Sequence, residues 1–210
     1  MQINSEFKRF RLTGITALLG SQPASQNLHE DYIMSKAPKE KDVSDEIDII
    51  KLEEKGLTVF ARDASDEEEP LALIDYQIKG FFKEVIYSLK SDLGIMAAKK
   101  KCDNYLFVEP RFIPIMRDGE VLVDEDEYCQ RPLRAQTMQG ERVTIASSEA
   151  VQTPWQIEFE VELIHNESTT KSKPITWDAV YTALDYGRRK GLGQFRNGGY
   201  GKFRWEEIEA

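Results

Sequence analysis

The segment from Gly191 to Phe203 reads GLGQFRNGGYGKF and separates a predicted helix from the last predicted strand of the chain. Five of its thirteen residues are glycine, and Arg196, Lys202 and three aromatic side chains stand among them. Glycine has no Cβ, so such a loop allows positive φ angles and the close approach of a ligand. Successive main-chain amides that point inward can bind an anion such as phosphate. The segment therefore predicts an anion-binding loop.

The residues on either side of this loop predict regular structure. After Thr176, which is a good N-cap, apolar residues recur at helical spacing as far as Leu184. Lys202–Ile208 (KFRWEEI) predicts the closing strand. Upstream, Gln156–Ile164 alternates strictly between apolar and polar residues, which is typical of a strand with one wet face.

The first half of the chain predicts a strand, a helix and a second strand. Phe7–Leu19 is rich in β-forming residues. Six apolar side chains in Ile78–Leu89 fall on one helix face, with Asp75 as the predicted N-cap and Gly94 just past the end. Asn104–Ile115 then predicts the second strand.

Several stretches do not belong to this pattern and predict insertions. The region Gly20–Lys41 is polar, and Val43–Lys55 predicts a short charged surface helix. A small hairpin is expected from Leu57–Arg62 and Leu71–Ile74. Arg131–Arg142 (RPLRAQTMQGER) is basic and predicts an irregular segment before a further strand.

Without the insertions, the predicted order is β-α-β-β-α-β, which is the ferredoxin-like arrangement of the α+β class. We therefore expect residues 1–210 to form a single domain, with insertions at about residues 20–74 and 116–150. This order of elements occurs in many unrelated proteins, so it does not by itself indicate an activity.

The distribution of charge along the sequence does not exclude an anionic partner. The net charge is −9, but residues 128–210 carry as many basic as acidic side chains, so the whole acidic excess falls on residues 1–127. The acidic runs Asp66–Glu69 and Asp124–Glu127 are typical of solvated loops. Whole-chain charge says little about a local groove.

The cysteines and the apolar runs exclude other classes of protein. Cys102 and Cys129 are too few for a disulfide framework and lack the spacing of a zinc site. The beginning of the sequence does not resemble a secretory signal, and no apolar run approaches the roughly 18 residues of a membrane span. We expect a cytoplasmic protein with no membrane partner, no metal and no cofactor.

The sequence resembles the RAMP superfamily of CRISPR-associated proteins, which bind or process guide RNA. The likeness rests on a glycine-rich loop between the second helix and the last strand of a ferredoxin-like order, here Gly191, Gly193, Gly198, Gly199 and Gly201. Together with DNYLFVEPR (Asp103–Arg111) and RPLRAQTMQGERV (Arg131–Val143), the loop also resembles uncharacterised proteins of phages and prophages of Gram-positive bacteria. That resemblance implies a bacterial host cell.

The RAMP resemblance implies that a single-stranded nucleic acid, with RNA favoured over DNA, lies along the sheet and the glycine loop. We expect Phe195, Tyr200 and Phe203 either to stack on bases or to be buried against the sheet. Arg131, Arg134 and Arg142 either line the same groove or pair with the acidic loops of the first half. The predicted binding residues of the loop and of the basic segment are Gly191, Gly193, Arg196, Asn197, Gly198, Gly199, Tyr200, Gly201, Lys202, Arg131, Arg134 and Arg142.

Catalysis is not part of the leading prediction. His29 is the candidate for a metal-independent ribonuclease, because a histidine titrates near neutral pH and lies where such RAMP enzymes place one. His165 is expected in a turn, and no nucleophile, base and acid set is visible. The alternatives to a non-catalytic binder are a protein-interaction or anti-defence module that binds a host or phage protein, and an endoribonuclease. Self-association is compatible with each of them.

Overall fold

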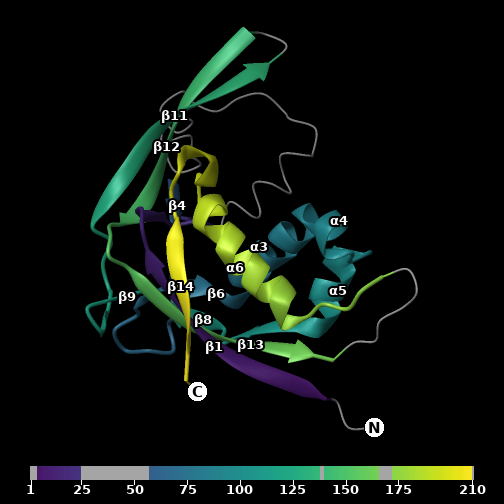
Figure 1. The fold of residues 1–210 in the computed structure, drawn as a ribbon. Coiled ribbons are helices and arrows are strands. Elements are labelled where there is room, and N and C mark those ends of the chain that lie inside the picture. Colours follow the sequence, from purple (N-terminus) through teal and green to yellow (C-terminus); the bar gives the residue numbers. More distant parts are fainter. Residues whose placement is uncertain (1–3, 25–56, 138–139, 166–171, 210) are drawn as a thin grey trace, which may run out of the picture.

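The computed structural model describes residues 4–24, 57–137, 140–165 and 172–209, which form a mixed α+β structure (Figure 1). Its main sheet has four central strands in the order β14, β1, β13, β7, and each is antiparallel to its neighbours. These strands are β1 (Ser5–Gly14), β7 (Leu106–Glu109), β13 (Gln156–Ile164) and β14 (Phe203–Ile208). The short hairpin of β9 (Met116–Arg117) and β10 (Glu120–Val121) extends the sheet beside β13. The predicted α+β class is confirmed.

Two long helices pack on one face of this sheet. In chain order α3 (Asp75–Ser88) lies between β1 and β7, and α6 (Trp177–Lys190) lies between β13 and β14. The apolar residues of β13 are buried beneath the helices, and its polar residues face the other side, as the alternation predicts. The short helices α4 (Lys90–Leu93) and α5 (Ala98–Tyr105) follow α3.

A glycine allows the second helix to pack closely on the core. A Cβ on Gly187 would lie 2.5 Å from the rings of both Phe81 and Phe203, so no larger residue fits between α6, α3 and β14. Phe81 and Phe203 pack edge to face with their centroids 5.7 Å apart, a favourable aromatic geometry. Phe203 is fully buried, so of the three aromatic residues of the loop this one belongs to the core.

Two of the predicted strands are each divided between two sheets. β1 ends at Gly14, where a Cβ would lie 2.2 Å from Nε1 of the fully buried Trp155, and the chain then enters β2 (Leu18–Leu19) of a second sheet. Asn104–Ile115 is likewise split into β7 and β8 (Phe112–Pro114), and β8 pairs with β6 (Leu71–Ile74). The prediction of one continuous strand was therefore wrong at both places, because a run of β-forming residues does not reveal a change of partner strand.

The predicted hairpin of the first half is confirmed only in part. β5 (Ala61–Arg62) pairs with β6, whereas β4 (Leu57–Val59) joins the second sheet beside β3 (Gln22–Pro23) and the later strand β12. The predicted helix Val43–Lys55 lies outside the described residues, as does most of the polar region before it.

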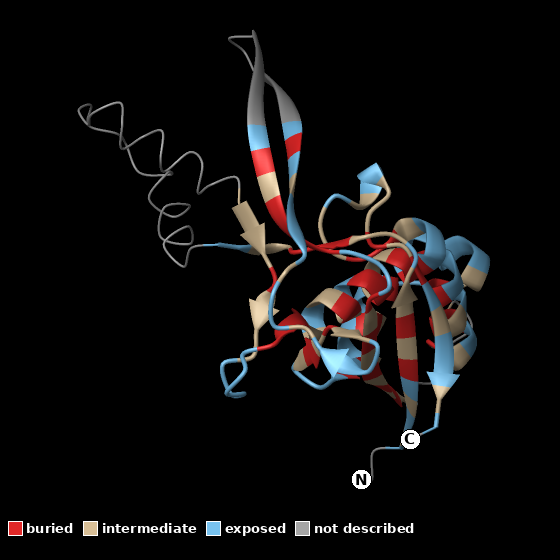
Figure 2. Ribbon diagram, turned by 90° about the vertical axis from the view of Figure 1, so that its left-hand side faces the viewer, coloured by how far each residue is buried: buried red, intermediate tan, exposed pale blue. Residues whose placement is uncertain are grey.

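The basic segment Arg131–Arg142 is not irregular but belongs to a long antiparallel hairpin. Its strands are β11 (Glu127–Thr137) and β12 (Gly140–Val151), which stand away from the main sheet (Figures 1 and 2). Pro132 and Gly140 are ordinary signals for a turn and misled the sequence interpretation. Proline is tolerated because, among the described strands, β11 is an edge strand with a hydrogen-bonded neighbour on one side only.

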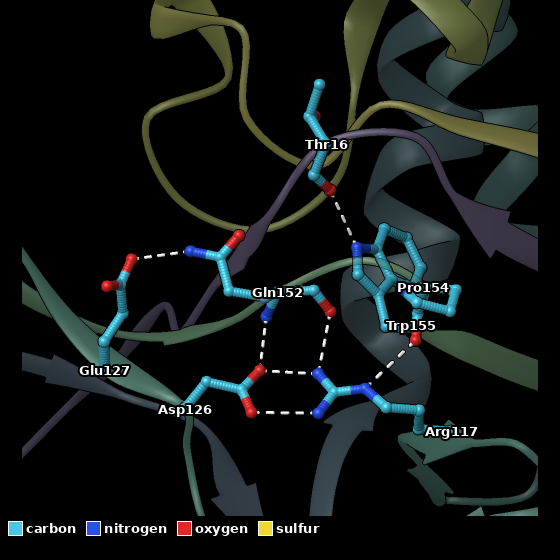
Figure 3. Close-up of polar contacts among 7 residues, drawn as sticks. All are labelled: Thr16, Arg117, Asp126, Glu127, Gln152, Pro154 and Trp155. Carbon is cyan, nitrogen blue, oxygen red and sulfur yellow. Dashed lines mark hydrogen bonds and ion pairs between the residues drawn. The ribbon is translucent and has the colours of Figure 1, made fainter.

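A network of polar contacts holds the base of this hairpin against the main sheet (Figure 3). The guanidinium of Arg117 makes a bidentate pair with Asp126, at 2.9 and 2.5 Å, and also donates to the carbonyl oxygens of Gln152 and Pro154. The amide of Gln152 donates to the same carboxylate at 2.6 Å. The turn at β9 and both ends of the hairpin therefore converge on one ion pair.

We expect the substitution Asp126→Asn to lower the free energy of unfolding by about 1 kcal/mol at pH 7, since the pair is partly exposed. The hydrogen bond from Arg117 holds the pKa of Asp126 below its ordinary value. A carboxylate with a lowered folded pKa stabilises the protein above the unfolded pKa of about 3.9 and loses that contribution as the pH falls through the folded value. The difference between the native chain and the variant should therefore shrink in urea titrations carried out below about pH 4.

The matched control is Asp124→Asn, which removes the same charge from an exposed residue that has no hydrogen bond or ion pair to the described residues. It should change the free energy of unfolding by less than about 0.5 kcal/mol. Equal effects of the two substitutions at pH 7 would contradict a stabilising role for the Arg117–Asp126 pair.

Candidate functional site

The glycine-rich loop lies between α6 and β14 and packs against the connection from β1 to β2. The amide of Gln194 donates to the carbonyl oxygen of Leu19 in β2 (3.1 Å), and the amide of Gly201 donates to that of Ala17 in the connection (2.8 Å). The amide of Leu192 donates to the Gly201 carbonyl oxygen across the loop at 2.9 Å. The loop is thus a compact part of the fold and includes a short 3₁₀ turn, η1 (Arg196–Gly198).

Three of its glycines are required by this packing. Gly191, Gly193 and Gly201 have φ angles of +74°, +72° and +69°. A Cβ on them would lie 2.4, 2.4 and 1.9 Å from a carbonyl oxygen of Tyr200, Leu19 and Leu192 respectively. These glycines are therefore explained by contacts within the chain, without a ligand.

The same packing uses several of the main-chain amides that were expected to receive a phosphate. The amides of Leu192, Gln194, Gly198, Gly199 and Gly201 already donate to carbonyl oxygens of the chain. An anion could reach these nitrogens only by displacing an internal hydrogen bond. The side chains of the loop are therefore more available to a ligand than these five amides.

Phe195 and Tyr200 are the aromatic side chains that the loop brings towards the surface. The Phe195 side chain is 39% exposed, and its ring centroid lies 5.8 Å from that of Tyr200. A Cβ on Gly198 would lie 2.2 Å from the Phe195 ring, so this glycine allows the ring to lie close to the main chain. The hydroxyl of Thr16 stabilises the C-terminal part of the loop. It donates to the Gly199 carbonyl oxygen at 3.0 Å and accepts from the Lys202 amide at 2.9 Å.

Arg131 of β11 lies directly against this aromatic pair. The carbon at the centre of its guanidinium is 4.8 Å from the centroid of the Phe195 ring, within the range of a cation–π contact. Its Nη1 donates to the hydroxyl of Ser148 at 2.9 Å, and that hydroxyl also contacts the Thr58 hydroxyl at 2.6 Å. The neighbouring Cys129 contacts the Tyr200 hydroxyl at 3.4 Å. The base of the hairpin and the glycine loop therefore form one surface.

Arg131 is a buried cation without a carboxylate partner among the described residues. The residue is only 7% exposed, yet it forms no ion pair with any carboxylate of the described residues. Its buried Nε has no hydrogen-bond partner there either. Burial of a charged group without a counter-charge is costly. The reading in which Arg131 pairs with an acidic loop of the first half is therefore wrong for the part of the chain that the structure describes.

The other predicted cations of the loop differ in whether a carboxylate already binds them. Arg196 and Lys190 both bind the carboxylate of Glu84, each at 2.8 Å, and the hydrogen bond from Lys190 is the main cause of the lowered pKa of Glu84. Lys202 makes no side-chain hydrogen bond or ion pair within the described ranges, and its Nζ would lie 3.8 Å from a Cβ placed on Gly199. Lys202 is thus freer than Arg196 to contact an anion.

The remaining predicted residues lie in different surroundings. Asn197 is exposed in η1. Arg134 and Arg142 are on the two strands of the hairpin, where their main chains pair with Val143 and Ala135, but their side chains are outside the described part of the structure. His29 lies outside the described residues. His165 is at the end of β13, where its Nε2 is 3.1 Å from a carboxylate oxygen of Glu6.

The open face of the main sheet carries paired charges. Arg11 binds Glu158 at 2.7 Å and Glu206 at 3.1 Å, and Arg9 contacts the same Glu158 at 3.3 Å. Glu160 and Glu162 of β13 stand on this face as well. These carboxylates compete with a phosphate for Arg9 and Arg11, so the placement of a nucleic acid along the sheet stays a prediction.

A metal site and a membrane-spanning helix are both absent from the described residues. No group of three or more histidine, cysteine, aspartate or glutamate side chains in them is arranged to hold a metal ion. Among the helices of that part of the chain, none combines the length and the apolar character of a membrane span.

The geometry defines an α+β protein with a surface of arginine, lysine and aromatic side chains at the junction of a glycine loop and a long hairpin. No family model matches the sequence, and no curated protein is similar to it in sequence. The fold is similar to that of a chain in the cryo-EM structure of the Type III-B Cmr-beta bound to cognate target RNA. The TM-score is 0.53 at 12% sequence identity, and the match covers 98% of this chain but 61% of that one. This chain therefore corresponds to less than two thirds of the neighbour's length, and the similarity concerns the fold.

Proposed function

We propose that this chain is a RAMP-type protein of phage origin that binds single-stranded nucleic acid, with RNA favoured, without cleaving it. Its four central strands and two long helices are then the ferredoxin-like β-α-β-β-α-β unit, and the long hairpin is an insertion in it. The fold likeness to a chain from a structure bound to target RNA supports RNA as the polymer.

The observation that carries the proposal is the buried charge of Arg131 beside Phe195, the ring that pairs with Tyr200. A guanidinium that is 7% exposed, stacked on Phe195 and without a carboxylate partner among the described residues is suited to a phosphate of the ligand. Phe195 and Tyr200 offer faces on which bases can stack, as in proteins that bind single strands without reading sequence.

In this proposal the side chains, and not the loop amides, contact the polymer. Lys202 contributes a further charge, whereas Arg196 is already neutralised in part by Glu84. The glycines shape the loop so that Phe195, Tyr200 and Lys202 are presented next to Arg131. Binding of this kind depends on phosphate charge and should weaken steeply with salt.

The test is the affinity of the full chain for a labelled single-stranded RNA of about 15 nucleotides, measured by fluorescence anisotropy over a range of salt concentrations. Lys202→Ala is expected to weaken binding about fivefold to tenfold, because it removes one charged contact. It should also make the slope of log K against log salt shallower by about 0.7.

Arg204→Ala is the matched control, because Arg204 is an exposed arginine of β14, two residues along the chain. It should leave both the affinity and the salt slope nearly unchanged. Absence of RNA and DNA binding by the native chain would overturn the proposal and favour a protein partner. Cleavage of the RNA that is lost in a His29→Ala variant would overturn its non-catalytic part.

A further inference from the structure

A hollow on the described part of the molecule lies over the outer side of α6, next to the glycine loop. It has a volume of about 570 Å³. Ile15, Leu89 and Tyr186 contribute apolar surface, and Arg188, Arg189 and Lys202 contribute positive charge. Figure 1 shows α6 on the outside of the sheet, with the glycine loop continuing from its end.

The cations of this hollow are not neutralised by the described part of the chain. Arg188 and Arg189 are exposed, and neither they nor Lys202 form an ion pair with a carboxylate there. Asp185, the acidic residue of the lining, accepts a hydrogen bond from Nε1 of Trp205 at 2.9 Å. Cations at the end of a helix also complement its dipole, but this effect does not account for Lys202, which lies beyond the loop.

The lining also exposes two apolar side chains, one on α6 and one in the segment after β1. Tyr186 is 40% exposed and Ile15 is 41% exposed, and both border the cations. An aromatic ring among unpaired basic side chains fits a ligand that has both a flat apolar group and a negative charge. A nucleotide has both.

Lys202 connects this hollow to the surface described above. Its side chain lines the hollow, and its Nζ is close to Gly199, within the loop that carries Phe195 and Tyr200. We propose that the hollow takes the next nucleotides of the same strand, with Tyr186 stacking on a base and Arg188 and Arg189 contacting phosphates. This inference rests on the proposed function and extends the strand from the hairpin base, across the loop, onto the outer side of α6.

The experiment compares single-stranded RNAs of about 5, 10 and 15 nucleotides against four full-length proteins, since single-strand sites typically span about 4–16 nucleotides. The proteins are the native chain, the double variant Arg188→Ala/Arg189→Ala, Tyr186→Ala and Tyr186→Phe. The double variant should bind the 15-mer about tenfold or more weakly, because two charged contacts are lost. Its effect should fall to less than about twofold for the 5-mer, which the loop surface alone can hold.

The two tyrosine variants separate stacking from general damage to the helix. Tyr186→Ala should weaken binding of the 15-mer about fivefold or more, and Tyr186→Phe, which keeps the ring, should stay within about twofold of the native chain. Thermal unfolding of each variant shows whether α6 remains folded. Arg204→Ala again controls for the loss of one positive charge.

The outcomes distinguish the inference from the proposed function. If no RNA binds the native chain, the proposed function fails. If the 15-mer binds and the double variant weakens all three lengths equally, or none of them, the hollow is not an extension of the strand site. Competition by a mononucleotide with the same affinity as the 15-mer would also overturn the inference, because the hollow would then be a site for a free nucleotide.

Discussion

Replacing Arg131 with methionine is expected to weaken RNA binding about tenfold or more while the free protein becomes about 1 kcal/mol more stable. The guanidinium is 7% exposed, its Nε has no partner in the described residues, and it has no counter-charge there. Methionine fills a similar volume, keeps contact with the Phe195 ring and removes the buried charge. Ser148 retains its contact with the Thr58 hydroxyl, so the substitution leaves no new unsatisfied group at this position.

Urea unfolding and fluorescence anisotropy of the same preparations measure the two effects. Arg131→Lys is the companion variant, since it keeps the charge but loses the planar group that stacks on Phe195. It should retain more affinity than the methionine variant and gain no stability. A methionine variant that is less stable and binds RNA as tightly as the native chain would show that Arg131 serves the fold instead of a ligand.

Replacing Gly201 with alanine is expected to lower the free energy of unfolding by about 3 kcal/mol or more. The φ angle of Gly201 is +69°, and a Cβ would lie 1.9 Å from the Leu192 carbonyl oxygen. The positive φ angle alone costs a non-glycine residue about 1–2 kcal/mol. The steric overlap with the main chain adds to that cost, because the loop must open to relieve it.

The matched control is Gly199→Ala, which has a positive φ angle of +90° but free space around the added carbon, apart from Lys202 Nζ at 3.8 Å. It should lower the free energy of unfolding by about 1–2 kcal/mol. Chemical denaturation of both variants isolates the steric contribution. If the two substitutions have equal effects on stability, the close packing of Gly201 against Leu192 is not what selects glycine there.

Elements with a strong apolar period were predictable from the sequence. The helix faces in Ile78–Leu89 and Trp177–Leu184 and the alternation in Gln156–Ile164 reappear as α3, α6 and β13. When one side of a helix or strand is buried, apolar residues recur along the sequence with the period of that element. Such elements can therefore be predicted from a short stretch of sequence. The ends of the strands were less accurate, as at Gly14, because they depend on contacts with distant residues such as Trp155.

The candidate site was only partly predictable. The sequence indicated the glycine loop, its aromatic residues and Arg131, but it could not indicate that loop amides such as those of Gln194 and Gly201 are used internally. That depends on Leu19 and Ala17, which are more than 170 positions away along the chain. The sequence also did not indicate that Arg196 binds Glu84 or that Arg131 donates a hydrogen bond to Ser148. Nor did it indicate that Tyr186 and Ile15 border one hollow.

By itself, the sequence determined the α+β class, the two long helices and the position of a glycine-rich loop before the last strand. These features follow from local spacing and from the conformational freedom of glycine. Only the tertiary structure decided that the glycines serve packing, that the basic segment is a hairpin and that Arg131 is buried with no counter-charge among the described residues. The physical reason is that hydrogen-bond partners, burial and ion pairs depend on contacts between segments far apart in the sequence. The local spacing of residues does not specify those contacts.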